Sequence, residues 1–251
     1  MTHVLALHAH PDDIETLGAG TLALLAANGH RITLATMTAG DCGSTETSLE
    51  ETARIRKAEA AAAASLIGAD YRCVGIGDLC VFNDDPTRRA TTETIRAVRP
   101  EIVITASPAD YHPDHEATSA LARDACFAST IVNYKTGPSA PLARIPHLYF
   151  MDAIEGRDRE GNRIAPHFGV DISARFETKL AMLLKHQSQF AWVIKQHGIT
   201  DLTASLQKWS AKQGRRFAVA YAEGFRQYTG TPYPRSELLQ ELVGSALRKA
   251  P

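Results

Sequence analysis

The sequence predicts an α/β fold in which a Rossmann-like, doubly wound and mainly parallel sheet is flanked by helices, with a less regular C-terminal half. The first observation is that short apolar runs alternate with helix-like stretches from the N-terminus to Ala128. The second is that loops rich in Gly, Ser, Thr and Asp follow the apolar runs, as at Thr38–Ser48. We find no internal repeat, low-complexity tract or linker, so we expect one domain over residues 1–251.

The N-terminal half reads as four strands, each followed by a helix. The expected strands are the apolar runs Val4–Ala9, Arg31–Met37, Tyr71–Ile76 and Glu101–Ala106. The expected helices, with Asn28-Gly29, Gly68 and Arg99-Pro100 as stop signals, are Glu15–Asn28, Leu49–Leu66, Thr87–Val98 and Glu116–Ala128.

The C-terminal half has weaker periodicity. His147–Met151 and Gly169–Ile172 read as strands, and Ser173–Gln189 and Leu202–Tyr228 as helices, the second one broken at Gly214. The segment Ile154–Phe168 carries glycines and charges, and we interpret it as an exposed hairpin, with a mobile lid as the alternative.

Composition excludes several classes of function. The net charge is −1, and no basic stripe is interleaved with aromatic residues, so we expect no nucleic-acid partner. No apolar run has the length of a membrane span. The N-terminus lacks the pattern of a secretory signal, so we expect a cytoplasmic protein. The four cysteines have no CxxC spacing, which favours reduced thiols.

Two short runs carry the chemistry: His10-Pro11-Asp12-Asp13 and His112-Pro113-Asp114-His115. The first follows the first expected strand, and the second follows the fourth. In the common strand order 3-2-1-4-5 these two strands are neighbours, and ligands bind in the crevice between their carboxyl ends. The topology therefore predicts that the two loops meet.

The two runs divide into metal ligands and spare groups. We expect His10, Asp13 and His115 to hold a divalent metal, because three protein ligands leave a position open for water. Asp12 is then the spare carboxylate that acts as general base. His112 can stabilise an oxyanion, and Asp114 can hold its ring. The alternative is that both runs are ordinary turn residues. Zn²⁺ is the expected ion, and the same donor set accepts Fe²⁺.

These runs, with Glu15, resemble the LmbE-like or PIG-L deacetylase superfamily. Three further features fit: Thr38-Ala39-Gly40-Asp41 followed by Gly43, the Arg56-x-x-Glu59 spacing, and Lys179, His186 and Gln189 farther on. The resemblance implies a Rossmann-like fold and zinc-dependent removal of acetyl from N-acetylated sugars. It also implies the roles given above for the residues of the two runs.

The substrate contacts are less well specified. Arg56, Asp78 and Asp41 are the candidates, but many relatives have Asp-Gly where this chain has Asp78-Leu79. Asp78 could equally be a turn residue. Arg56 could equally lie on a solvated helix face, paired with Glu59 or Glu51.

We therefore expect a hydrolase that removes acetyl from the amide nitrogen of a small N-acetylglucosamine-type sugar or glycoconjugate. One alternative is an amidase for a larger acyl conjugate. Another is a sugar-nucleotide binding module without catalysis, although a phosphate-cradling Gly-rich turn is missing after the first strand. The identity of the substrate, and the choice between monomer and homo-oligomer, stay open.

Overall fold

The computed structural model describes residues 1–190, 192 and 201–250. Within them, one sheet has the strand order β3-β2-β1-β4-β5-β7-β6-β8, so the predicted order 3-2-1-4-5 is confirmed for the first five strands. β1 to β5 pair in parallel, and β7, β6 and β8 continue the sheet antiparallel. The strands are β1 (His3–His8), β2 (Arg31–Thr38), β3 (Asp70–Ile76), β4 (Ile102–Thr105), β5 (His147–Met151), β6 (Phe168–Asp171), β7 (Ala222–Tyr228) and β8 (Leu247–Lys249).

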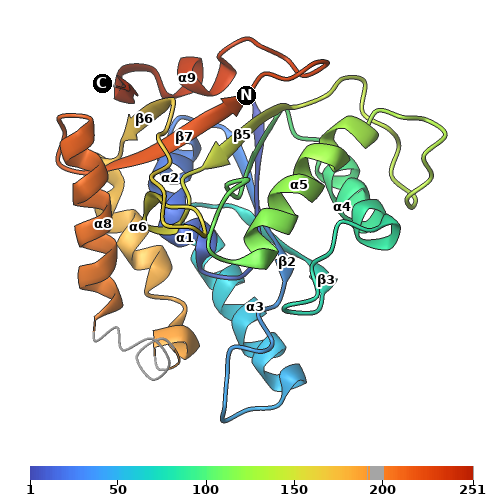
Figure 1. Ribbon diagram of the computed structural model, residues 1–251, viewed down its shortest axis with the longest axis horizontal. Helices are drawn as coiled ribbons and strands as arrows, with labels where there is room; N and C mark the ends of the chain where they lie inside the picture. The colour runs from blue at the N-terminus through green and yellow to red at the C-terminus, as the bar shows by residue number, and fades with distance from the viewer. Residues whose placement is uncertain (191, 193–200, 251) are drawn as a thin grey trace.

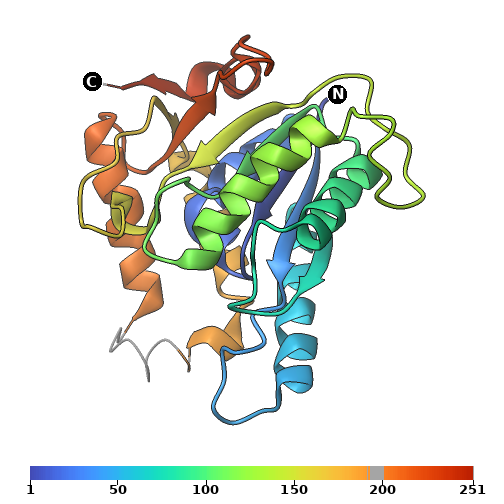
Figure 2. The ribbon, with the colours of Figure 1, turned by 45° about the vertical axis from the view of Figure 1, so that its right-hand side comes forward.

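Helices cover both faces of the sheet (Figure 1, Figure 2). Alternate side chains of β1 enter two separate cores: Val4 packs in one with residues of α2 and α6, and Leu5 in the other with residues of α4 and α5. The helices are α1 (Asp13–Leu17), α2 (Ala19–Ala27), α3 (Leu49–Ser65), α4 (Asp85–Val98), α5 (Pro113–Ala128), α6 (Phe176–Leu183), α8 (Leu202–Arg216) and α9 (Leu238–Val243). Short 3₁₀ turns lie at Ile154–Gly156, Ser173–Arg175 and Gly244–Ala246.

The starts of helices α3 and α5 follow from local sequence signals. α3 starts after Ser48, whose hydroxyl accepts the backbone N–H of Glu51. α5 starts after His112, with Pro113 at its first position, where the missing N–H of proline costs nothing. The sequence thereby fixes His112 and His115 on either side of a helix start.

The C-terminal half corrects one prediction. The expected helix Leu202–Tyr228 ends at Arg216, and its last seven residues form strand β7. The helix ends where Ala218 adopts a left-handed conformation with a φ of 56°. The chain then folds back over Gly214, where an added Cβ would lie 2.3 Å from the carbonyl oxygen of Ala220. Two smaller differences are that Glu15–Asn28 is split at Gly18 into α1 and α2, and that the expected helix Ser173–Gln189 is interrupted after Leu183.

The segment between β5 and β6 matches the hairpin interpretation. Arg157 and Arg163 form an isolated antiparallel bridge, and Gly161 at the turn has a φ of 84°. No helix among the described residues is long and apolar enough to cross a membrane.

Candidate metal centre and catalytic cavity

A cavity of about 320 Å³ lies where the carboxyl ends of β1 and β4 meet, as the strand order predicts. The loops after β2 and β3 close its other sides. Its lining residues are His10, Asp12, Asp13, Cys42, Gly43, Arg56, Asp78, Leu79, Tyr111, His112, His115, Gln189 and Trp192.

The first His-Pro-Asp run forms a sharp turn between β1 and α1. Asp12 has a φ of 89°, a conformation that non-glycine residues adopt rarely. The Arg56 guanidinium donates to the carbonyl oxygen of Pro11 at 2.8 Å, and the backbone N–H of His10 donates to Asp13 Oδ2 at 2.8 Å. These two bonds hold the turn in place.

The three expected ligands converge on one point. Asp13 Oδ2 lies 3.3 Å from His10 Nδ1 and 3.3 Å from His115 Nε2. All three side chains are at most one-tenth exposed. The structure therefore brings together residues that are about a hundred positions apart in the sequence.

The remaining ring nitrogens of the two histidines face carboxylates. His115 Nδ1 is 3.1 Å from Asp110 Oδ1. His10 Nε2 is 3.1 Å from Asp78 Oδ1 and 3.3 Å from Asp114 Oδ2. Histidines that bind metals usually donate their second N–H to such a carboxylate, which fixes the ring and its tautomer.

The charges of the cluster are strongly coupled. Burial would raise the pKa of Asp13, but His115 and His8 beside it hold that pKa well below its usual range. Burial raises the pKa of Asp12 to about 6, although Arg56, whose nitrogen lies 3.6 Å away, opposes the shift. A carboxyl group with a pKa raised in this way can accept a proton near neutral pH.

His112 is oriented differently from the expectation. Its Nδ1 accepts the backbone N–H of Asp114 at 3.2 Å, whereas the Asp114 carboxylate accepts the N–H of Leu79 at 2.8 Å and faces His10. The ring is thus held by the backbone of Asp114 and not by its side chain. Burial and the neighbouring His10 and His115 lower the pKa of His112. A neutral ring that accepts at Nδ1 carries its proton on Nε2.

The three residues predicted to contact the substrate, Arg56, Asp78 and Asp41, differ in their position relative to the cavity. Arg56 is 4% exposed and is bonded to the carbonyl oxygens of Pro11 and Gly40, so it does not lie on a solvated helix face. Asp78 lines the cavity beside His10. Asp41 is not among the lining residues, and its carboxylate accepts the backbone N–H of Asp78.

Sequence reasoning missed Asp110, Tyr111 and the position of Trp192. Asp110 is fully buried beside His115, and the need of a ligating histidine for a carboxylate partner was the signal that could have found it. Tyr111 and Trp192 line the cavity, and no spacing in the sequence indicates this. His8 of β1 is fully buried, with its Nδ1 2.7 Å from Asp13 Oδ2.

The donor set fits a divalent metal. Ligand atoms about 2.0–2.1 Å from a tetrahedral ion are about 3.3 Å apart, which matches the distances from Asp13 Oδ2 to His10 Nδ1 and to His115 Nε2. Their donors are two imidazoles and a carboxylate, which suit zinc or ferrous iron. Among the described residues, three overlapping groups bring possible ligand atoms close together. They are His8 with Asp13 and His115, His10 with His112 and His115, and His10 with Asp78 and Asp114.

Fold and site together define a class: an α/β enzyme with a His/Asp site for a metal ion at the switch point of its sheet. The profile described as "PIG-L: GlcNAc-PI de-N-acetylase" matches residues 5–126. A Bacillus cereus protein named probable N-acetyl-alpha-D-glucosaminyl L-malate deacetylase 2 is 30% identical over 218 residues, which is 82% of this chain and 93% of that protein. The chain belongs to the PIG-L family.

A solved structure supports the same conclusion for the fold. The N,N'-diacetylchitobiose deacetylase of Pyrococcus horikoshii superposes with a TM-score of 0.77 at 25% identity, over 94% of this chain and 88% of that chain. The predicted fold class and family are confirmed. These relatives are named deacetylases, which places the chain in a family of amide-hydrolysing enzymes, as expected.

One relative has a different reaction in its name. The 4-oxalmesaconate hydratase of Pseudomonas putida is 27% identical over 187 residues, which is 71% of this chain and 70% of that protein. Proteins similar to this chain thus have more than one reaction in their names, and the assignment for this chain depends on its own side chains.

Proposed function

We propose that this chain is a zinc-dependent N-deacetylase that converts an N-acetylglucosamine-type sugar or glycoconjugate and water into the free amine and acetate. One observation supports the proposal. Asp13 Oδ2 lies 3.3 Å from a ring nitrogen of His10 and of His115, the separation expected for two ligands of one ion, while Asp12 and His112 line the same cavity. The site therefore has three ligands and two further groups for proton and charge chemistry. We place the reaction in the cytoplasm, where its four unpaired thiols would stay reduced.

His10, Asp13 and His115 would hold the metal, with Asp110 fixing the ring of His115. A bound zinc ion supplies a Lewis acid that polarises the amide carbonyl and lowers the pKa of water. Ferrous iron is the alternative ion for the same donors.

Asp12 and His112 carry the proton and charge chemistry. Asp12 accepts a proton from the attacking water, for which its raised pKa is suited. The Nε2–H of neutral His112 hydrogen-bonds the carbonyl oxygen as negative charge develops there. Asp12 then returns the proton to the amide nitrogen as the C–N bond breaks. The products are a primary amine and acetate.

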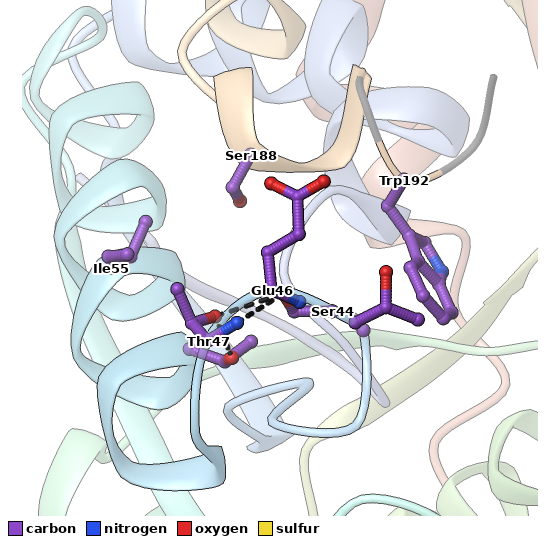
Figure 3. A pocket seen from close by; sticks show the side chains of 9 residues that line it. Ser44, Glu46, Thr47, Ile55, Ser188 and Trp192 are labelled. Atoms are coloured by element: carbon purple, nitrogen blue, oxygen red, sulfur yellow. Dashed lines mark hydrogen bonds between the residues drawn. The ribbon is translucent and has the colours of Figure 1, made fainter. Parts of the chain in front are cut away.

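The sugar would lie between the loops after β2 and β3, beside Asp78. A neighbouring pocket of about 180 Å³ shares Gly43 and Trp192 with the catalytic cavity. Figure 3 shows Trp192 on one side of it and Ile55 and Ser188 on the other. We assign this pocket to the group attached to the N-acetyl sugar, because an indole face and hydroxyls suit a second ring with hydroxyl groups.

The test is release of primary amine and acetate from N-acetylated substrates by protein that has been stripped of metal and reloaded with zinc. The panel is N-acetylglucosamine, diacetylchitobiose, and N-acetylglucosamine linked to inositol or to malate. We expect Asp12→Asn to lower kcat/KM by about 10²–10⁴-fold, because it removes the general base. Glu50→Gln, an exposed change on α3, is the matched control.

Three other results would replace the proposal. Release of a longer acyl group, with no acetate from any N-acetyl substrate, would identify an amidase. Water addition to an unsaturated dicarboxylic acid without amine release would identify a hydratase. Thermal stabilisation by sugar nucleotides but not by zinc would identify a binding module without catalysis.

A further inference from the structure

A second cleft lies away from the catalytic cavity, between α8 and residues 154–165. Two adjoining pockets of about 580 and 420 Å³ form it, and they share Glu155, Arg157, Trp209 and Lys212. Both ribbon views place the yellow segment after β5 beside the orange helix α8 (Figure 1, Figure 2). None of the residues that line this α8 cleft lines the catalytic cavity.

The wall of the α8 cleft is apolar. Leu17 of α1, Leu183 of α6 and Leu206 of α8 line it, and all three are at most 5% exposed. The Trp209 indole stands between the two pockets. At Gly156, whose φ is 66°, an added Cβ would lie 3.1 Å from Trp209 Cη2, so glycine there lets the loop pack directly against the indole.

The rim of the α8 cleft is strongly basic. Four of its cations are spaced along one side of α8, and two more come from the facing hairpin, against a single lining carboxylate, Glu155. All six are exposed, and among the described residues none of them forms an ion pair. The six are Arg157, Arg163, Lys208, Lys212, Arg215 and Arg216.

A solvated basic helix face would explain the cations but not the concave apolar wall beneath them. Like charges one turn apart repel, as in the pairs Lys208–Lys212 and Lys212–Arg216, and a bound anion relieves that repulsion. Lys212 Nζ also lies 5.0 Å from the centre of the Trp209 ring, so a positive charge and an aromatic surface are offered together.

We infer that the α8 cleft binds a small amphiphilic anion, with its apolar body against Trp209 and the leucines and its phosphate or carboxylate head between Lys212 and Arg216. The size of the cleft is that of a small-molecule site. A second copy of the chain is a poor occupant, because a two-fold contact would bring the same cations face to face. Either an aromatic ring or an acyl chain can pack against the apolar wall as the body of this anion.

Binding can be read from Trp209 alone, because the chain has two tryptophans and Trp192→Phe leaves Trp209 as the single emitter. We would titrate this variant with ATP, with decanoate and with inorganic phosphate. We expect a saturable change in Trp209 emission with ATP or with decanoate, and the ligand that binds more tightly identifies the body as an aromatic ring or an acyl chain. Inorganic phosphate should bind at least tenfold more weakly.

Two paired variants separate a site from general charge attraction. Lys212→Gln/Arg216→Gln should weaken binding at least tenfold, whereas Lys57→Gln/Lys135→Gln removes the same charge from exposed positions elsewhere and should not. Glu155→Gln should tighten binding of the anion, because it removes the lining carboxylate that repels it. A variant that merely lost its fold would bind more weakly. The inference is overturned if neither organic anion gives saturation at 1 mM, if phosphate binds as tightly as they do, or if the control pair has the same effect as Lys212→Gln/Arg216→Gln. It is also overturned if light scattering shows a dimer that Lys212→Gln/Arg216→Gln dissociates.

Discussion

The N-terminal part of the molecule, residues 1–128, is called here the parallel half, and residues 147–250, whose strands β6, β7 and β8 pair antiparallel, the antiparallel half. The two halves use buried charge in opposite ways. In the parallel half, charged groups such as Asp12, Asp13 and His115 line a cavity at the strand ends. In the antiparallel half, Lys179 and Glu223 pair at 2.6 Å deep inside, away from any cavity described above. From this comparison we infer that the first half carries the proposed chemistry and that the second half supports it.

The support is specific. Glu223 on β7 accepts the backbone N–H groups of Gly20 and Thr21, at the start of α2, as well as the ammonium of Lys179. It therefore ties the antiparallel half to the helix that follows α1 and the catalytic turn. Ser188 makes a second tie, since its backbone N–H and its hydroxyl both donate to Glu59 on α3, at 2.8 and 2.6 Å.

Lys179→Met should give the largest effect on stability and would test the supporting role directly. Removing one partner of a buried ion pair leaves an uncompensated charge, which costs about 3–5 kcal/mol. We expect the free energy of unfolding in urea to fall by that amount, while kcat of the remaining folded enzyme stays within about twofold.

The double variant Lys179→Met/Glu223→Gln is the matched control, because it removes both charges and should recover part of the lost stability. If Lys179→Met instead lowered kcat and left the unfolding free energy unchanged, the division between a chemical half and a supporting half would be wrong.

The same division explains what could be predicted from the sequence. The proposed ligands of the parallel half were predictable because each lies in the segment that follows a strand, and parallel topology brings strand ends together. The order of the strands alone was enough to predict that His10 and His115 lie close together. Strand β7 was misread because its buried positions include Glu223 and Gln227, so it shows neither an apolar run nor a regular alternation. Their partners, Lys179 and Ser236, are visible only in the folded chain.

The supporting contacts depend on partners far apart in the chain. Glu223 reads as a surface charge until Lys179 and the start of α2 are placed beside it. Arg56 lies at a spacing that the family resemblance indicates, but the sequence does not say that it bonds the carbonyl oxygens of Pro11 and Gly40. Long-range hydrogen bonds of this kind have no periodic signal, so sequence patterns cannot find them.

Asp152→Asn should give the next largest effect, and its sign depends on pH. Asp152 is 3% exposed, and burial raises its pKa from 3.8 to about 6, although Arg226 and Arg216 oppose the shift. Because the folded-state pKa lies above the unfolded one, the stability that this carboxyl contributes is complete below about pH 4 and is lost as the pH rises through 6.

We therefore expect Asp152→Asn to be more stable than the parent at pH 8, by at most about 3 kcal/mol, and equal to it near pH 4. Urea unfolding at both pH values measures this, with the exposed Glu241→Gln as a variant that should not depend on pH in this way. Equal stability of Asp152→Asn and the parent at pH 8 would show that a bound solvent or cation already compensates the charge.

Asp110→Asn should give the smallest change in free energy and probes the chemical half. The variant keeps the size of Asp110 but removes the negative charge that lies 3.1 Å from His115 Nδ1. Loss of such a carboxylate partner typically costs about 10–100-fold in metal affinity or activity. We expect the zinc dissociation constant, measured by competition with a chelator, to rise by that factor. The metal-free protein should also lose stability, because Asp110 accepts the backbone N–H groups of His112 and Ile154 and, with Asp13, raises the pKa of the buried His115 to about 9. Asp85→Asn, at an exposed position on α4, should change neither quantity. Unaltered zinc affinity would mean that His115 is not a ligand. Unaltered metal-free stability would mean that the contacts of Asp110 with His112, His115 and Ile154 add nothing to the fold.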